Sequence, residues 1–142
     1  MPQELEDLQT SLGYSLPSAY LRFLAETNGA EWCIHNGNAG ECLAMWQVNE
    51  IIAMSQGYQI QRWLPRVLAI GSDSGGDAIA FDRSSLFHPD SWPVARVGFG
   101  DLEADEMILQ ANSLVDWVSN EFRLIKSDSQ RSTSAGEKSW QP

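Results

Sequence analysis

The sequence predicts an α+β domain in which a largely antiparallel sheet is flanked by helices, and three observations support this fold class. Two short apolar runs, Val67–Ile70 and Ala78–Phe81, enclose the Gly- and Asp-rich segment Gly71–Asp77, which is the pattern of a β-hairpin. Helical periodicity occurs near the start, in one central stretch and at the end of the chain. The alternating run Val94–Phe99 follows the hairpin, and consecutive strands favour antiparallel pairing over a doubly wound parallel sheet.

The first third of the chain is predicted to hold two helices. Leucines recur at helical spacing over Leu5–Leu12, and Gly13 ends this helix. A second helix begins at Pro17, because proline fits a first helical turn whose N–H groups have no intrahelical partner. Asn28-Gly29 ends it, since both residues tolerate the left-handed conformation of a helix terminus.

The middle of the chain mixes element types. Glu31–Glu41 is predicted to be a loop, because it is rich in Asn and Gly, and Cys42–Trp46 is predicted to be a strand. A third helix is expected over Val48–Gly57. Tyr58–Pro65 is interpreted as a connector to the hairpin.

The last third begins with the polar, turn-rich segment Arg83–Pro93. After the strand Val94–Phe99, an acidic loop leads to a short edge strand at Met107–Leu109. Ser113 starts a final helix whose expected apolar face is formed by Leu114, Val118, Phe122 and Ile125. Residues 1–126 are therefore predicted to form one domain, followed by a flexible polar tail over 127–142, which lacks the apolar residues needed to order it.

Composition limits the classes of function. The chain has 142 residues, and 43% of them are apolar, as in a globular domain with an ordinary core. Its 19 acidic and 9 basic residues give a net charge of −10. Nucleic acids and anionic membranes repel such a protein, so neither is an expected partner. A basic protein partner is compatible with this charge, although many soluble proteins are acidic without such a partner.

The two cysteines, Cys33 and Cys42, are too few for a multi-disulfide scaffold. The sequence contains no secretory signal pattern and no apolar run of membrane-spanning length. These observations predict a cytoplasmic protein with free thiols. A Cys33–Cys42 bridge that closes the intervening segment is the alternative.

Three hypotheses of a catalytic or metal-binding site have less support from the sequence than a purely structural role of the same residues. Asp73-Ser74-Gly75-Gly76 is similar to the nucleophile loop of chymotrypsin-like proteases, but neither His35 nor His88 lies in that family's histidine motif. Asp73 and Asp77 offer oxygen ligands for Ca²⁺, yet the closing Glu of a twelve-residue calcium loop is missing, and a tight turn explains both residues better. Cys33, His35, Cys42 and His88 lack zinc-site spacing. No metal or cofactor is therefore predicted.

Six tryptophans make this residue type a candidate for binding. Trp117 is expected in the core or at its rim, because it neighbours the apolar face of the last helix. Trp46 ends a predicted strand, whereas Trp32, Trp63 and Trp92 fall in predicted loops or connectors, where side chains more often contact partners.

Four carboxylates are concentrated in one loop between the last two predicted strands. They are Asp101, Glu103, Asp105 and Glu106. Such a run is usually a solvated surface, but for a basic partner it is the place where electrostatic steering would concentrate.

Several landmarks occur together in a specific order and spacing. They are Leu16-Pro17-x-x-Tyr20-x-x-Phe23-Leu24, Asn28-Gly29, Gly71-Ser72-Asp73-x-Gly75-Gly76-Asp77 and Leu114-x-x-Trp117-Val118. Over about Leu5 to Phe122 the chain resembles the SUKH superfamily, the group of the fungal cell-wall assembly regulators of the Smi/Knr type and their bacterial toxin-immunity-like relatives. The segment between Asp82 and Val94, with Trp92-Pro93, departs from the family pattern.

This resemblance implies an α+β fold and a role without enzymatic activity. Bacterial members look like immunity proteins that neutralise a cognate toxin, often a nuclease, and others look like scaffolds for intracellular partners. The leading hypothesis is therefore an immunity protein that occludes a basic toxin. A regulatory scaffold is the second hypothesis, and a small metal-dependent hydrolase is a remote third. The expected contact residues are Trp32, Trp46, Trp63, Asp73, Asp77, Asp101, Glu103 and Asp105.

Overall fold

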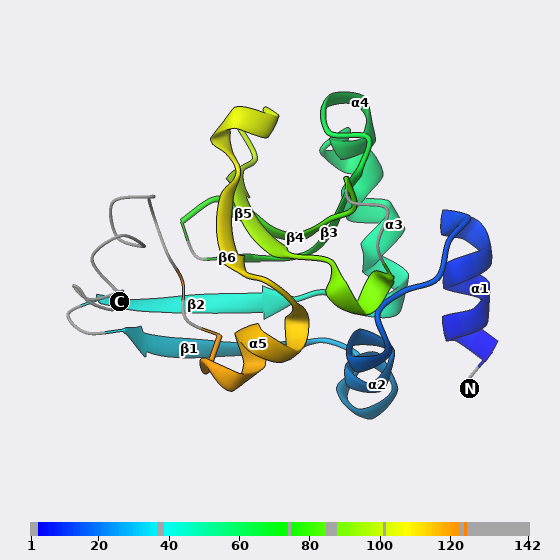
Figure 1. Cartoon of the computed structure of the whole chain (residues 1–142), viewed down its shortest axis with the longest axis horizontal. Coiled ribbons are helices and arrows are strands. Elements are labelled where there is room, and N and C mark those ends of the chain that lie inside the picture. The colour runs from blue at the N-terminus through cyan, green and yellow to red at the C-terminus, as the bar shows by residue number, and fades with distance from the viewer. Residues whose placement is uncertain are drawn as a thin grey trace.

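The computed structural model describes residues 3–36, 39–73, 75–84, 88–100, 102–122 and 124, and it confirms the α+β fold class (Figure 1). Six strands form one antiparallel sheet in the order β1-β2-β3-β4-β5-β6. The strands are β1 (Ala30–Asn36), β2 (Ala39–Met45), β3 (Val67–Asp73), β4 (Asp77–Asp82), β5 (Val94–Gly98) and β6 (Ile108–Ala111). The helices are α1 (Gln3–Leu12), α2 (Ser18–Thr27), α3 (Val48–Gly57), α4 (Ile60–Trp63) and α5 (Leu114–Ser119).

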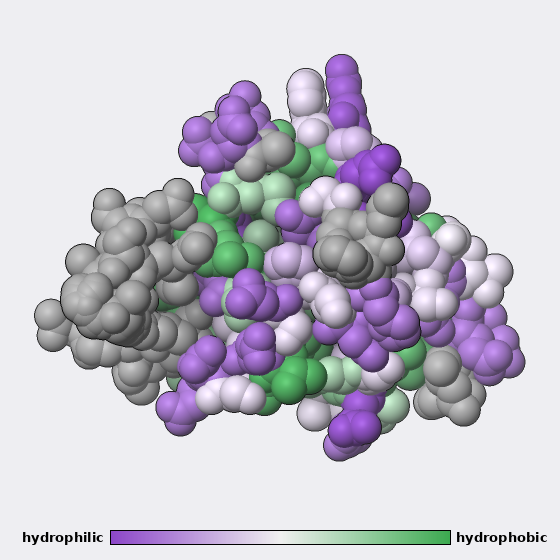
Figure 2. All heavy atoms as spheres, in the orientation of Figure 1, coloured by the Kyte–Doolittle hydropathy of each residue, from purple (hydrophilic) through white to green (hydrophobic). Residues whose placement is uncertain are grey.

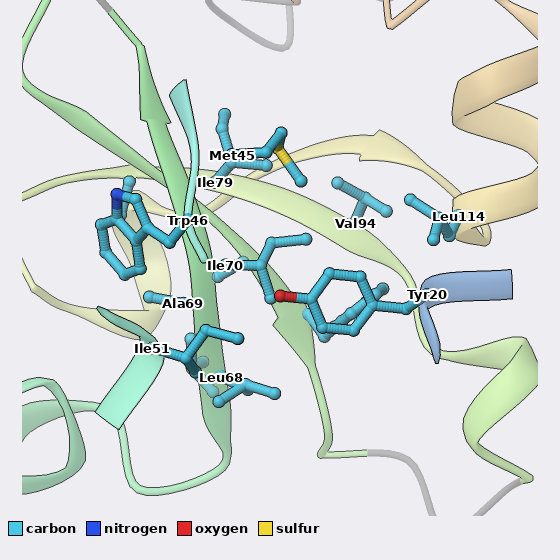
Figure 3. Close-up of a cluster of buried hydrophobic side chains, with 14 of the residues drawn as sticks. Tyr20, Met45, Trp46, Ile51, Leu68, Ala69, Ile70, Ile79, Val94 and Leu114 are labelled. Atoms are coloured by element: carbon cyan, nitrogen blue, oxygen red, sulfur yellow. The ribbon is translucent and has the colours of Figure 1, made fainter. Parts of the chain in front are cut away.

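The centre of the sheet is the predicted β3–β4 hairpin. Strand register places Leu68, Phe81 and Val94 opposite one another, so their side chains share one face. Tyr20 of α2 and Leu114 of α5 belong to the same buried cluster, and the Tyr20 ring meets Phe81 edge to face at a centroid distance of 5.3 Å (Figure 3). The hydrophobic core therefore lies between the sheet and the helices, as the apolar runs predict.

Helix α2 confirms the local rules read from the sequence. It begins directly after Pro17, and its buried residues are Tyr20 and Leu24. Asn28 ends it in the left-handed conformation, with φ of 44°, and donates its backbone N–H to the Leu24 carbonyl over 2.9 Å. Gly29, also left-handed, leaves no room for a Cβ, because one built there would lie 2.8 Å from the Gln47 side chain.

The segment that departs from the family pattern holds α2 in place. A short 3-10 turn, η1 (Pro89–Ser91), presents the Asp90 carboxylate, which accepts a 2.6 Å hydrogen bond from the backbone N–H of Ser18. Trp92 is buried beside it and contacts the rings of Tyr14 and Phe81. This polar, turn-rich stretch is therefore part of the folded domain.

The predicted loop over Glu31–Glu41 is wrong, because the chain there forms the β1–β2 hairpin. Strand β2 pairs with β3 only at Leu43–Met45, so the far part of the hairpin extends past the sheet as a two-stranded ribbon (Figure 1). The predicted loop was inferred from Asn and Gly content, which does not reveal the partner strand that the fold supplies.

The expectation of free thiols is also wrong. Cys33 and Cys42 lie directly opposite each other in the β1–β2 register, with Cα atoms 3.9 Å apart, and form a disulfide. The pairing of β1 with β2 brings the two cysteines together. The bridge closes the ribbon, as the alternative interpretation proposed.

Helix α5 is shorter than predicted. It ends at Ser119, and both Glu121 and Phe122 have φ of 58°. The Phe122 N–H donates a 2.9 Å hydrogen bond to the Trp117 carbonyl. This bond, together with the left-handed backbone of Glu121, is a Schellman motif, which ends the helix. The expected apolar face is therefore only partly correct, because Val118 is exposed. Trp117 is fully buried, as predicted.

The predicted division into a domain over 1–126 and a tail over 127–142 stays a prediction, since residues 125–142 lie outside the described part of the chain. Among the described residues, no helix has the length and apolar character needed to cross a membrane.

Candidate protein-binding surface

The Gly- and Asp-rich loop is shorter than the predicted Gly71–Asp77, because β3 continues to Asp73 and β4 begins at Asp77, and the turn between them is organised by one carboxylate. The Oδ1 atom of Asp73 accepts hydrogen bonds from the backbone N–H groups of Gly75 (2.8 Å) and Asp77 (2.9 Å). An Asp that accepts from backbone two and four residues ahead stabilises a turn without a regular ladder. The structural interpretation of this aspartate as a turn residue is confirmed.

The carboxylates of Asp73 and Asp77 together bind a buried arginine. The Arg96 guanidinium on β5 forms an ion pair with Asp73 through Nη2 and a 2.9 Å contact with Asp77 through Nε. Arg96 is buried, the Asp73 side chain is fully buried, and the Asp77 side chain is 35% exposed. The guanidinium therefore occupies the position between the two carboxylates where the calcium reading placed a cation.

The residues of the other catalytic and metal-binding hypotheses are only partly described by the structure. Ser74 and the His35 side chain lie outside the described residues, and His88 is exposed, where its Nδ1 accepts from the Asp90 N–H over 3.2 Å. Cys33 and Cys42 are bonded to each other, so their sulfur atoms are not thiolate ligands. Within the described part of the chain, no group of three or more His, Cys, Asp or Glu residues is arranged to hold a metal.

The tryptophans divide into core and surface residues. Trp46, Trp92 and Trp117 are buried, and Trp32 is half-buried against Phe122 at a centroid distance of 4.9 Å. Trp63 at the end of α4 is 56% exposed. Among the described tryptophans, it alone is more than half exposed.

A row of stacked aromatic rings connects the core with the surface around Trp63. Trp46, buried at the end of β2, stacks on Phe99 at 6.5 Å between centroids, and Phe99 stacks on Tyr58 at 3.9 Å. Tyr58 is 42% exposed. Parallel rings that begin in the core and end at the surface fix the position of Phe99 although it follows β5 in a turn.

Trp63 and Phe99 line a cleft of about 370 Å³ together with Gly100, Leu102 and Glu103. We call this hollow the Trp63 cleft. Trp63 also lines a second hollow of about 420 Å³, whose apolar lining includes Met107 and Leu109. An exposed indole between two hollows offers apolar area that a partner can bury from both sides.

Carboxylates surround one side of this surface. Glu103, Asp105 and Glu106 are exposed in and beside the short turn η2 (Ala104–Glu106), whereas Asp101 lies outside the described residues. Figure 2 shows hydrophilic side chains over this β5–β6 connection and over α4, with hydrophobic surface between them. Two cations are also near: the Arg62 guanidinium lies over the Trp63 ring at 4.9 Å from its centroid, and Arg66 lines the second hollow.

An apolar groove of about 340 Å³ lies elsewhere on the molecule, between α2 and α5. Phe23, Leu114, Val115, Val118 and Phe122 contribute to its lining, and Val115 and Val118 are exposed. Sequence reasoning missed this groove because it assigned Val118 to the buried face of a longer helix.

Of the eight predicted contact residues, Trp63, Glu103 and Asp105 lie on one surface. Sequence reasoning missed Tyr58, Phe99 and Leu102, which complete it. The signal available for Phe99 was its place at the end of a strand, directly before the acidic loop. Nothing local in the sequence indicated that Tyr58 would stack on it, because the two residues are brought together only by the fold.

The fold and this surface define a class of protein: a small α+β domain whose exposed aromatic and acidic side chains suit it to bind another molecule. The sequence model of the SMI1 / KNR4 family (SUKH-1) matches residues 2–120, and the chain belongs to that family. A comparison with curated proteins finds no match. Membership supports a non-catalytic protein-binding or immunity-like module in general.

Proposed function

We propose that this protein is an immunity protein that binds a basic toxin, for example a nuclease domain, and neutralises it by covering its active surface. The contact is made by the Trp63 surface, which comprises Tyr58, Trp63, Phe99, Leu102, Glu103, Asp105 and Glu106. The observation that carries the proposal is the exposed Trp63 side chain, which lines a cleft beside exposed carboxylates. The protein performs no chemistry in this role.

Two physical terms support this assignment. Burial of a large exposed indole in a complementary pocket supplies binding energy, because such aromatic anchors dominate protein interfaces. The carboxylates and the net charge of −10 attract a basic partner and raise the rate of encounter. A nuclease surface that binds phosphates carries the complementary charge.

The remaining predicted contact residues have other roles in the proposal. Trp46 supports the cleft from the core through Phe99. Asp73 and Asp77 hold Arg96 and the β3–β4 turn. Trp32 packs on Phe122, away from the proposed surface. Asp101, outside the described residues, remains a proposed contact in the acidic loop.

The test uses the protein encoded next to this chain, because an immunity protein is made beside its toxin. Affinity is measured by calorimetry and the association rate by stopped-flow fluorescence, for the natural chain, for Trp63→Ala and for the double variant Glu103→Gln, Asp105→Asn. We expect Trp63→Ala to weaken the affinity by about tenfold or more. The double variant slows association, whereas Glu26→Gln on α2, another exposed carboxylate, changes neither quantity.

Genetics separates this proposal from the scaffold alternative. Deletion of an immunity gene sensitises the cell to the neighbouring toxin, whereas deletion of a scaffold does not. Equal toxin affinity in all variants would reject the Trp63 surface, and absence of any toxin binding together with an unaffected deletion strain would reject the immunity role.

The proposed function leaves the cellular compartment of the protein to be tested by the redox state of its cysteine pair. A cytoplasmic location was predicted from the low cysteine count and from the lack of a secretory signal pattern and of a membrane-spanning apolar run. The Cys33–Cys42 bond weighs against it, because cytoplasmic glutathione and thioredoxin keep thiols reduced. Mass spectrometry of alkylated protein, prepared directly from cells, determines the state of the pair.

A further inference from the structure

We propose that the Trp63 cleft binds an arginine side chain of the partner, with the guanidinium stacked on the Trp63 indole and paired with Glu103. The inference rests on the proposed function, since it names the group that the protein-binding surface recognises. Its basis is the chemistry of the lining: two aromatic side chains, one aliphatic side chain, one backbone glycine and one carboxylate.

The indole of the cleft is suited to a flat cation. The face of an indole ring carries a partial negative charge and attracts a guanidinium placed over it. Trp63 already has such a partner within the chain, because the carbon of the Arg62 guanidinium lies 4.9 Å from its ring centroid. Arg62 is in turn held by a 3.2 Å hydrogen bond to Gln59. The ring therefore accepts a guanidinium in the folded protein.

The carboxylate makes the cleft selective for a charged ligand. Glu103 lines the cleft and is exposed, and Asp105 and Glu106 follow it in the chain. A carboxylate can accept two parallel N–H bonds from one guanidinium. A cation that enters between Trp63 and Glu103 thus gains stacking and an ion pair at once.

Arginine fits this arrangement better than lysine. A guanidinium is planar, stacks on aromatic faces and is less strongly hydrated than an ammonium group. Phe99 is fixed by stacking on Trp46 and Tyr58, so the aromatic part of the lining is organised before the ligand arrives. Less ordering on binding means that more of the contact energy appears as affinity.

The experiment titrates the full-length, ¹⁵N-labelled chain with three blocked peptides: acetyl-Gly-Arg-Gly-amide, its lysine analogue and its citrulline analogue. Citrulline keeps the shape of arginine without the charge. The readout is the chemical shift of the Trp63 indole N–H, assigned with Trp63→Phe. We expect a saturable shift with the arginine peptide, about twofold to fivefold weaker binding of the lysine peptide and no saturable shift with citrulline.

Two variants localise the effect. Glu103→Gln lowers affinity for the arginine peptide by about twofold to fivefold, and the matched carboxylate change Glu26→Gln leaves it unchanged. Arg62→Ala raises affinity by about twofold to fivefold, because it frees one ring face and removes a like charge. A merely structural role of Trp63 would not produce this gain.

Equal shifts with arginine and citrulline overturn the proposal, as does an arginine response that Glu103→Gln and Glu26→Gln reduce alike. These titrations need no toxin. A chain that binds the arginine peptide but no toxin retains the cleft assignment and loses the immunity role. A chain that binds the toxin but not the peptide retains the role and loses the cleft assignment.

Discussion

Arg96 brings a positive charge into the interior of the sheet, where an unpaired ion would be very costly. One carboxylate oxygen of Asp73 forms an ion pair with Arg96, and the other accepts the hydrogen bonds that organise the β3–β4 turn. One side chain thus joins the turn to strand β5. This double role explains why an aspartate, and not another turn former, suits the position.

We therefore predict that Asp73→Asn lowers the free energy of unfolding by about 3–5 kcal/mol, since the amide still accepts the turn hydrogen bonds but leaves Arg96 without its buried counter-ion. Asp77→Asn lowers it by only about 1 kcal/mol or less, because its side chain is 35% exposed and water replaces part of the interaction. Urea unfolding of both variants, with the exposed Asp105→Asn as control, measures the difference. Equal losses for the two variants would contradict this account of Arg96.

Tyr20 supplies a second prediction for a single residue. Its ring packs on Phe81, but its buried hydroxyl has no hydrogen-bond partner among the described residues. A buried, unpaired hydroxyl is destabilising. We expect Tyr20→Phe to keep the ring contact and to raise the free energy of unfolding by about 1 kcal/mol near neutral pH. A clear loss of stability would show that the hydroxyl is satisfied.

Alkaline pH separates the effect of this hydroxyl from packing. Burial raises the pKa of Tyr20 above its ordinary value of 10.0, so the native state holds the phenolic proton more tightly than the unfolded state does. The free energy of unfolding is therefore unaffected by the titration of Tyr20 below about pH 10 and decreases as the pH rises above that value, because the unfolded chain then loses the proton first. Unfolding measured at about pH 7 and about pH 11 should therefore show a smaller alkaline loss for Tyr20→Phe than for the natural chain.

At the scale of elements, the β1–β2 ribbon depends on a covalent link. Only Leu43–Met45 of β2 pair with β3, so the disulfide lies in the part that has no third strand beside it. An isolated two-stranded ribbon is marginally stable in water. The Cys33–Cys42 bond therefore supports the element where the sheet does not.

Reduction of this bond is expected to lower the free energy of unfolding by about 2–3 kcal/mol. The reason is that the segment between the two cysteines, which are nine residues apart, then gains conformational entropy in the unfolded chain. The measurement is urea unfolding with and without reductant, combined with hydrogen exchange of the ribbon amides. The double variant Cys33→Ser, Cys42→Ser is the control and should not respond to reductant. Two titratable thiols in the native, unreduced protein would exclude the bond.

The elements also show which parts of the fold a sequence can predict. Helix α2 and the β3–β4 hairpin were predicted correctly because Pro17, Asn28 and the Gly/Asp turn act locally. The β1–β2 hairpin and the early end of α5 were not, because they depend on strand register and on the contacts of Phe122 with Trp32 and Trp117. Contacts between distant residues are not encoded in local periodicity.

At the scale of the whole molecule, the same distinction applies to the binding surface. Residue type and loop position placed Trp63, Glu103 and Asp105 among eight predicted contact residues, and their contact with a partner stays a prediction. Residue type and loop position were not sufficient to separate these from Asp73, whose side chain the fold buries against Arg96. The surface itself arises because α4 and the β5–β6 connection, which are distant in sequence, both line the Trp63 cleft.

The net charge of −10 acts on the molecule as a whole, and it should act in opposite directions on folding and on binding. Like charges repel within the compact state, so screening them stabilises the fold, whereas screening weakens attraction to a basic partner.

Between about 0.01 M and about 0.1 M sodium chloride the Debye length falls from about 30 Å to about 10 Å. We expect the free energy of unfolding to rise by on the order of 1 kcal/mol and the rate of toxin association to fall by about tenfold. Chemical denaturation and stopped-flow association on the same samples measure both, and potassium chloride should give the same result. If association does not slow while the fold is stabilised, the charge serves the solubility of the protein and does not steer its partner.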